Sequence, residues 1–225
     1  MSAPSANTNH PWIRRLRKAL LLALIPGLAI GVFALYLVAN HNFHVVAPGI
    51  LYRSGQMSGA ALAKSIQEHG IKSILNLRGA GNGQDWYTAE ITVAQQFGVE
   101  HFDYPLSATR ELNAQEMDDI LDTIERAPKP MLIHCKSGSD RTGLIGALYL
   151  YSVKGEPANK AGRQLATLYG HLPFLFWSGT IAMDRSYWRY VGTHDQPARN
   201  AVKAASLAQD PASAPGAFLA RGQAQ

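Results

Sequence analysis

The longest apolar stretch of the chain lies near its N-terminus, where residues 19–39 read ALLLALIPGLAIGVFALYLVA without a charged side chain. At about 1.5 Å per residue, a helix of this length crosses a hydrocarbon core of about 30 Å. Pro26 and Gly27 are compatible with it, because membrane helices tolerate both residue types. The pattern predicts one transmembrane helix over 19–39, preceded by an N-terminal segment over 1–18.

A cleaved signal peptide and a buried core helix are the alternatives for this stretch. It is longer than the roughly 7 to 15 apolar residues of a signal peptide, and Leu37-Val38-Ala39 is a poor cleavage site. A core helix is rarely apolar all round beside four cations, and Arg14, Arg15, Arg17 and Lys18 directly precede this one. We therefore expect an uncleaved single-pass anchor in the inner (plasma) membrane.

The orientation of the anchor is predicted from the same cations, because positively charged flanks stay in the cytoplasm. The remainder of the chain then lies outside, which in a bacterium means the periplasm. A chain with a single cysteine is compatible with that compartment.

Beyond residue 40, short apolar runs alternate with helix-length amphipathic segments, and Pro48-Gly49 and Gly70 supply turn or stop signals. Strands are expected over 43–46, 50–53, 71–77, 99–104 and 131–133. Helices are expected over 58–68, 85–97, 113–126, 142–153 and 157–169, with one or two more in 174–190. This alternation predicts an α/β domain over 43–191, in which helices flank a largely parallel central sheet. The composition of residues 192–225 predicts a flexible tail.

Composition and charge narrow the possible functions. The formal net charge is +5, but outside the N-terminal cluster the basic residues form no run, so a membrane surface is a better partner for that cluster than nucleic acid. The one cysteine, Cys135, excludes an intrachain disulfide and any metal site built from several thiolates. Cys135 is then either a buried apolar residue or a reactive thiol.

The residues around Cys135 favour a reactive thiol. His134-Cys135-Lys136-Ser137-Gly138-Ser139-Asp140-Arg141-Thr142-Gly143 follows an expected strand and leads into an expected helix. Successive backbone N–H groups at such a helix N-terminus point at one anion, and Arg141 adds a planar cationic fork suited to two phosphoryl oxygens. We expect Lys136, Ser137, Gly138, Ser139, Asp140 and Arg141 to bind phosphate, with Gly138 supplying an unusual backbone angle.

The positive field of this loop favours the thiolate form of Cys135, which can attack phosphorus and form a cysteinyl-phosphate. Thr142 is a candidate donor of a hydrogen bond to the sulfur, which helps the sulfur to leave. His134 is expected to orient the loop rather than to act as a base. No metal or other cofactor is required by this chemistry.

The sequence His-Cys-x5-Arg-Thr-Gly resembles the signature of the protein tyrosine phosphatase superfamily, and its dual-specificity branch in particular. Residues 51–55 and 70–78 also resemble the opening of bacterial and fungal atypical dual-specificity phosphatases, so the resemblance extends over roughly 43–191. It implies a dual-specificity-phosphatase-like fold and a hydrolase that acts on phosphotyrosine or phosphoserine proteins or on other phosphomonoesters.

Two aspartates are candidates for the general acid that protonates the leaving group. Dual-specificity enzymes carry their acid on a separate loop, and Asp103 stands 32 residues before Cys135 at the end of an expected strand. Asp140 instead resembles the Asp-Arg-Thr aspartate of the myotubularin and Sac lipid phosphatases. We favour Asp140, because Tyr104-Pro105-Leu106 departs from the usual acid-loop pattern. With Lys136, the segment Cys135-Lys136-Ser137-Gly138 resembles the Cys-Lys-x-Gly loops of phosphatases that act on inositol phospholipids.

The leading prediction is therefore a metal-independent, cysteine-dependent phosphatase of the tyrosine or dual-specificity type, acting on proteins or on a phospholipid or sugar phosphate near the membrane. The alternative is a catalytically inactive phosphate-binding module tethered to the membrane. A thiol redox or sulfur-transfer protein fits less well, since there is no second cysteine to resolve a disulfide.

Overall fold

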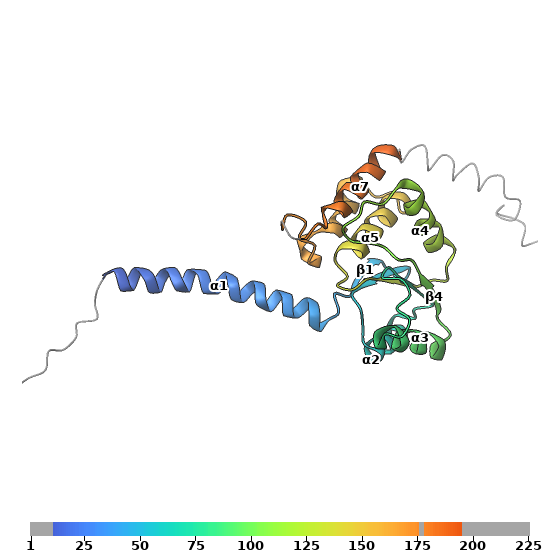
Figure 1. Ribbon diagram of the computed structural model, residues 1–225, viewed down its shortest axis with the longest axis horizontal. Coiled ribbons are helices and arrows are strands. Elements are labelled where there is room, and N and C mark those ends of the chain that lie inside the picture. Colours follow the sequence, from blue (N-terminus) through green and yellow to red (C-terminus); the bar gives the residue numbers. More distant parts are fainter. Residues whose placement is uncertain (1–10, 176–177, 195–225) are drawn as a thin grey trace, which may run out of the picture. The chain divides into compact units, whose positions relative to one another are not determined.

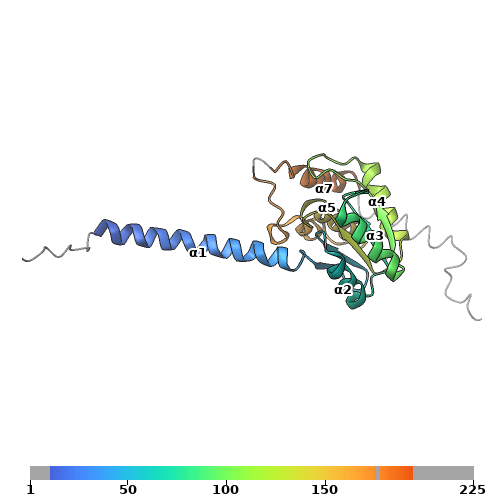
Figure 2. The same cartoon turned by 60° about the horizontal axis from the view of Figure 1, so that its bottom comes forward.

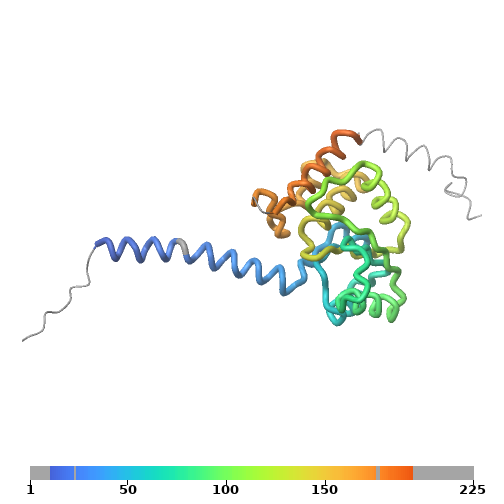
Figure 3. The backbone as a smooth tube through the Cα atoms, in the orientation of Figure 1, coloured from blue at the N-terminus to red at the C-terminus, as the bar shows by residue number. Residues whose placement is uncertain are grey.

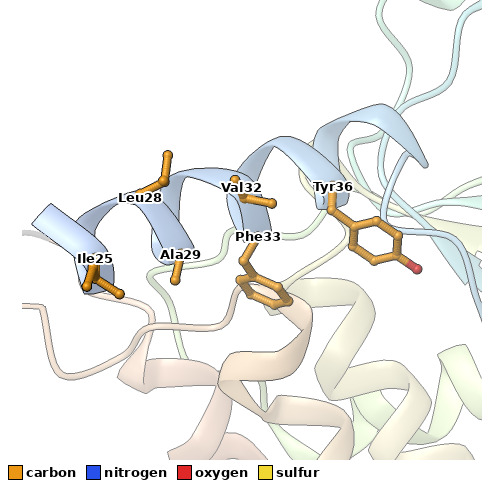
Figure 4. A pocket seen from close by; sticks show the side chains of 6 residues that line it. All are labelled: Ile25, Leu28, Ala29, Val32, Phe33 and Tyr36. Carbon is orange, nitrogen blue, oxygen red and sulfur yellow. The ribbon is translucent and has the colours of Figure 1, made fainter.

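The computed structural model describes residues 11–175 and 178–194. By its internal contacts the chain divides into an N-terminal unit that ends at Asn40 and a second unit that begins at His41. The first unit contains helix α1 (Pro11–Ala39), which includes Pro26. By length and composition α1 is apolar enough to cross a membrane. Figure 4 shows six of its side chains, which line an apolar hollow along the helix: Ile25, Leu28, Ala29, Val32, Phe33 and Tyr36.

The second unit is built on one five-stranded sheet in the order β1-β2-β5-β3-β4. The strands are β1 (His44–Ala47), β2 (Leu51–Ser54), β3 (Ser73–Asn76), β4 (Glu100–Asp103) and β5 (Met131–His134). Only the β1–β2 pair is antiparallel, whereas β2, β5, β3 and β4 run parallel to one another. The expected α/β class and largely parallel sheet are therefore confirmed. Strand β5 lies at the centre, and all four of its residues are buried.

Helices cover both faces of this sheet (Figures 1 and 2). Helices α2 (Gly59–His69) and α3 (Asp85–Phe97) lie on one face, where Ile66, Ile74 and Leu132 belong to one apolar core. Helices α4 (Ala114–Arg126), α5 (Asp140–Ser152) and α7 (Ile181–Thr193) lie on the other face, over a larger core. In Figure 3, α5 (yellow) and α7 (orange-red) run beside each other.

Local sequence signals account for several of the observed helix ends. Ser58 is the N-cap of α2, with its Oγ accepting a hydrogen bond from the backbone N–H of Ala61 (3.3 Å), and Gly70 ends the helix with φ 62°. Asn113 and Glu116 form a reciprocal capping box at the start of α4. The helix and strand periodicities had placed these elements within a few residues of where they occur.

The segment after α5 differs from the expected continuous helix over 157–169. It contains a single turn, α6 (Ala158–Ala161), followed by two 3₁₀ segments, η1 (Gly162–Leu165) and η2 (Thr167–Tyr169). The prediction was wrong because the backbone carbonyl of Gln164 accepts a hydrogen bond from the buried guanidinium of Arg53 (2.8 Å). In the 174–190 region, α7 begins at Ile181, and the flexible tail predicted for 192–225 lies almost wholly outside the described residues.

Candidate active site

The loop between β5 and α5 leaves the carboxyl end of the central parallel strand, where ligand sites of α/β sheets occur. It carries Cys135, which is only 1% exposed. The backbone N–H of Gly138 donates to Cys135 Sγ at 3.3 Å. The chain therefore curls around the sulfur and directs at least one amide toward it.

The carbonyls of this loop point outward and are held by the rest of the domain. Each of four successive carbonyls accepts a hydrogen bond from a residue N-terminal to the loop. The pairs are Gln56 N to Lys136 O (3.1 Å), Asn42 Nδ2 to Ser137 O (2.9 Å), and Arg53 Nη2 to Gly138 O (2.6 Å) and Ser139 O (3.3 Å). Because a peptide N–H points opposite to its carbonyl, this arrangement turns the N–H groups toward the interior of the loop.

Arg53 is the central support of the loop. Its side chain is fully buried, and its Nη1 donates to both the backbone oxygen (2.8 Å) and the Oε1 (2.7 Å) of Gln164. Its guanidinium also stacks on the Tyr169 ring at 4.1 Å. Burial lowers the pKa of Arg53 to about 10, against the opposing influence of Tyr169, Cys135 and Asp140, so the group is still a cation at neutral pH.

The backbone at Gly138 leaves no room for a side chain, so no other residue fits this position. Its φ is +76°, a left-handed conformation that favours glycine. A Cβ there would approach the backbone N of Gly55 to 2.6 Å and the carbonyl carbon of Ser54 to 2.7 Å. Neither neighbour can move without disturbing β2, so the loop requires glycine here.

Arg141 and Thr142 are placed in the first turn of α5, next to the loop. Arg141 Nη1 donates to the carbonyls of Leu77 (3.2 Å) and Leu106 (3.1 Å), which fixes the plane of the guanidinium. Its Nε and the Thr142 Oγ1 are buried and have no hydrogen-bond partner among the described residues. Two unsatisfied donors therefore remain next to the sulfur-bearing loop.

Asp140 lies at the N-terminus of α5, and its carboxylate contacts a buried histidine. Its Oδ1 is 2.7 Å from His171 Nδ1, and the Nε2 of the same ring is 2.8 Å from Asp184 Oδ2 of α7. Burial opposes a charge on His171, but the hydrogen bonds to the two carboxylates outweigh it and raise the pKa of His171 to about 9. The ring is therefore an imidazolium at neutral pH.

Asp103 ends β4, and both of its carboxylate oxygens accept hydrogen bonds from the protein. Oδ1 accepts from Asn76 Nδ2 at 2.7 Å, and Oδ2 accepts from the hydroxyl of Tyr87. This last bond, together with burial, raises the pKa of Tyr87 to about 12. Asp103 thus ties β4 to β3 and α3.

His134, the residue before Cys135, belongs to a buried polar cluster centred on Glu90 of α3. Glu90 Oε1 is 3.0 Å from His134 Nε2 and 2.8 Å from His101 Nε2, and its Oε2 accepts from Gln56 Nε2 at 2.7 Å. Burial alone would raise the pKa of Glu90, but the hydrogen bonds from His101, His134 and Gln56 hold it well below the usual range. The cluster fixes the orientation of His134.

The outer part of the loop is more accessible. Lys136 and Ser137 are exposed, whereas Ser139 is buried. Arg78 stacks on Trp86 at 3.5 Å and donates to Gln56 Oε1 at 3.0 Å. Arg78 is thus a second cation near the loop. Burial and the neighbouring Arg141 lower the pKa of Arg78.

The structure thus brings together most of the residues that the sequence had singled out. Residues 135–142 form one continuous loop and helix start, whereas Asp103 lies at the end of β4, where His101 (3.9 Å) and Glu90 link it to His134. Sequence reasoning missed Arg53, Glu90 and His171. Arg53 occurs within an expected strand, where a fully buried arginine is rare, and the other two act through contacts between residues far apart in the chain.

No group of three or more His, Cys, Asp or Glu side chains in residues 11–175 and 178–194 has an arrangement suited to a metal ion.

Comparison with known proteins places this arrangement in context. The model of the tyrosine phosphatase family matches residues 36–159. Curated protein sequences give no match. Among solved structures, TpbA from P. aeruginosa has a TM-score of 0.52 at 23% identity, covering 72% of this chain and 91% of TpbA.

Two further structures are similar to the same extent. A TpbA variant in complex with pTyr has a TM-score of 0.52 at 21% identity, covering 73% of this chain and 91% of that one. The core catalytic domain of the PP-IP phosphatase SIW14 from S. cerevisiae, in complex with citrate, has a TM-score of 0.54 at 16% identity, covering 73% and 92%. At these identities the likeness shows a shared fold.

Proposed function

The chain belongs to the tyrosine phosphatase family, and on this premise we propose that it hydrolyses phosphomonoesters through a covalent intermediate on Cys135. One observation carries the proposal. The carbonyls of residues 136–139 are bonded outward, which turns the loop's amides toward its interior, and Gly138 N donates to Cys135 Sγ at 3.3 Å. Such an array binds a phosphoryl group and stabilises a thiolate at its base.

In the first chemical step, the Cys135 thiolate attacks phosphorus and the P–O bond to the leaving group breaks. The charge on the transferring phosphoryl oxygens is stabilised by the loop amides and by Arg141, whose Nε has no partner among the described residues. A protonated carboxylic acid supplies its proton to the leaving oxygen. The product of this step is a cysteinyl-phosphate.

In the second step, water attacks the cysteinyl-phosphate, the carboxylate takes up the proton of the water, and the thiolate is released with inorganic phosphate. Thr142 assists by donating a hydrogen bond from its buried Oγ1 to the departing sulfur. That hydroxyl has no other partner among the residues described.

We assign the general acid to Asp140. Its Oδ1 is occupied by His171, and no hydrogen bond to its Oδ2 occurs in the part of the chain that the structure describes. Both oxygens of Asp103, by contrast, accept hydrogen bonds from neighbouring side chains. Asp140 is also the residue before Arg141 at the start of α5, next to the loop that is proposed to bind the phosphoryl group.

Two substrate classes are proposed, and they are separable by assay. The TpbA variant is in complex with pTyr, and SIW14 is described as a PP-IP phosphatase, so the two similar structures suggest two kinds of substrate to test. In this chain the exposed Lys136 at the outer part of the loop favours a substrate with a second phosphate. A phosphoinositide or other phosphorylated lipid and a phosphotyrosine or phosphoserine protein are the substrates to compare.

The proposed location of the reaction rests on α1 as an uncleaved anchor. Asn42 lies three residues after Ala39, the last residue of α1, and its side chain donates to the loop at Ser137 O. A residue close to the end of α1 along the chain therefore supports the reaction loop. We propose a single-pass inner-membrane enzyme whose catalytic domain faces the periplasm and acts on substrates at or near the bilayer.

The test is phosphate release by the purified full-length chain from phosphotyrosine peptides, phosphoserine peptides, phosphoinositides in vesicles and sugar phosphates. We expect turnover of at least one class, its abolition in Cys135→Ser, and a large loss in Arg141→Lys, because lysine lacks the planar fork. Arg163→Lys, at an exposed arginine in the same region, is the matched control and should retain activity.

Two results would reject the proposal. If wild type releases phosphate from none of the four classes, or if Cys135→Ser retains turnover, the reaction is not the one described. Binding of vanadate without turnover would favour the alternative, a membrane-tethered phosphate-binding module. Sulfur transfer from thiosulfate would instead favour thiol chemistry of another kind.

A further inference from the structure

His171 forms a bridge between two carboxylates that come from different parts of the fold. It follows η2, is completely buried, and contacts Asp140 Oδ1 of α5 at 2.7 Å and Asp184 Oδ2 of α7 at 2.8 Å. The side chains of the two aspartates are partly exposed, 20% and 25%. The ring therefore fills the space between the reaction loop and α7.

Counting protons shows why the ring has to be charged. An ionised carboxylate only accepts hydrogen bonds, and a neutral imidazole has a single N–H, so it can satisfy only one of the two contacts. A doubly protonated ring donates to both. The charged groups that face this cluster are Asp140 from α5, Asp184 from α7 and, acting on Asp140, Arg53 from β2.

The bridge constrains Asp140 in a particular way. With Oδ1 held by a buried ring that cannot turn without breaking its bond to Asp184, the carboxyl group of Asp140 has one fixed orientation. Oδ2 is then the oxygen left to interact with a substrate.

We propose that His171, braced by Asp184, is the positioning residue of Asp140, and that it fixes Oδ1 so that Oδ2 faces the leaving oxygen. The inference rests on the proposed function. In the free enzyme Asp140 is ionised, and the negative charge of a phosphoryl group bound beside it favours protonation of Oδ2 by solvent. In the first step that proton passes to the leaving oxygen; in the second, Oδ2 takes a proton from the attacking water. His171 keeps both of its protons throughout.

The experiment compares two amide replacements of the ring on two substrates. The amide of asparagine can replace Nδ1 and still donate to Asp140, whereas that of glutamine can replace Nε2 and still donate to Asp184. Phenyl phosphate has a leaving group with a pKa near that of tyrosine, about 10, and needs an acid. p-Nitrophenyl phosphate has a much more acidic leaving group and needs it far less.

We expect His171→Gln to lower kcat/KM for phenyl phosphate by about 100-fold, within the range that general acids contribute, but for p-nitrophenyl phosphate by less than about tenfold. His171→Asn should recover part of the loss on phenyl phosphate, and Asp184→Asn should show a smaller loss of the same kind. Asp140→Asn should reproduce the leaving-group pattern of His171→Gln.

The matched control is Asp118→Asn. Asp118 of α4 also braces α7: its Oδ1 accepts from the hydroxyl of Tyr190 at 2.8 Å, and its Oδ2 is 3.6 Å from His194 Nε2. Asp118→Asn should leave kcat/KM unchanged for both substrates. The NMR titration of the His171 ring provides a readout that needs no turnover, and its pKa should fall from about 9 in wild type when either Asp140 or Asp184 becomes asparagine.

Equal losses on the two substrates, or no advantage of asparagine over glutamine, would overturn the inference and leave His171 as a purely structural bridge. An unchanged His171 titration in Asp140→Asn would overturn it as well. The proposed function fails separately, by retention of turnover in Cys135→Ser, which the His171 variants do not affect.

Discussion

Replacement of Arg53 tests whether the conformation of the loop depends on the support behind it. Arg53→Met removes four hydrogen bonds and leaves three buried acceptors, Gly138 O and both oxygens of Gln164, without the guanidinium. At about 2 kcal/mol for each of the three unsatisfied acceptors, the free energy of unfolding falls by about 6 kcal/mol. Ser139 O is not included, because it also accepts from Gly143 N at 3.0 Å.

Part of this loss is offset, because burying the guanidinium is itself unfavourable. Burial lowers the pKa of Arg53 from 12.5 to about 10, a difference that corresponds to about 3 kcal/mol returned when the charge is removed. The net destabilisation of Arg53→Met is then about 3 kcal/mol, comparable to the cost of breaking other buried charged contacts.

The activity of Arg53→Met should fall further than its stability suggests. Without the outward bonds at Gly138 O and Ser139 O, the amides no longer hold their orientation around the phosphoryl group. Misplacing even one such donor costs about 10²–10³ in rate. Arg53→Lys should be intermediate, because one ammonium cannot reach all four acceptors.

Two quantities are measured on the full chain. Urea titration gives the free energy of unfolding of the unit that begins at His41, and kcat on an aryl phosphate is measured well below the unfolding midpoint. Arg163→Met, at an exposed arginine of η1, is the control and should change neither quantity. If Arg53→Met folds with wild-type kcat, the outward bonding of the carbonyls is not what shapes the site, and the reasoning is refuted.

Three further predictions concern the same loop. Gly138→Ala should abolish turnover, by more than about 100-fold in kcat, because its Cβ would lie within 2.8 Å of the backbone at the end of β2; wild-type kinetics would contradict this. Because hydrogen bonds raise the pKa of His171 to about 9, its stabilisation is complete below pH 6.5 and is lost as the pH rises through 9. The Tm of wild type should therefore fall over that interval, and His171→Gln should flatten the fall, as differential scanning calorimetry would reveal. Asp140→Asn should lower kcat on phenyl phosphate far more than Asp103→Asn, and the reverse order in a steady-state assay would transfer the role of acid to Asp103.

Much of this fold is predictable from sequence, because the determining interactions are local. The apolar Met131-Leu132-Ile133 run becomes the fully buried central strand β5, and Ser58 and Gly70 bound α2 as their capping properties require. The order of strand, loop and helix around Cys135 follows from periodicity and from one glycine. Each of these features depends on residues close together in the chain.

The supports of the site depend on contacts that the sequence alone does not disclose. Arg53 reaches Gln164 across 111 positions and Gly138 across 85. Its hydrogen bond to the Gln164 carbonyl takes an acceptor that the helix expected over 157–169 would use. His171 reaches Asp140 across 31 positions. Nothing in the local sequence of Arg53 or His171 distinguishes a buried charge from a surface one.

The central claim is that phosphate is transferred to Cys135, and acid quenching during turnover tests it most directly. The full-length enzyme, mixed with a ³²P-labelled or otherwise traceable phosphomonoester, should yield a single phosphorylated peptide that contains Cys135, and Cys135→Ser should yield none. Turnover without a label on Cys135, or a label at another residue, would contradict the account.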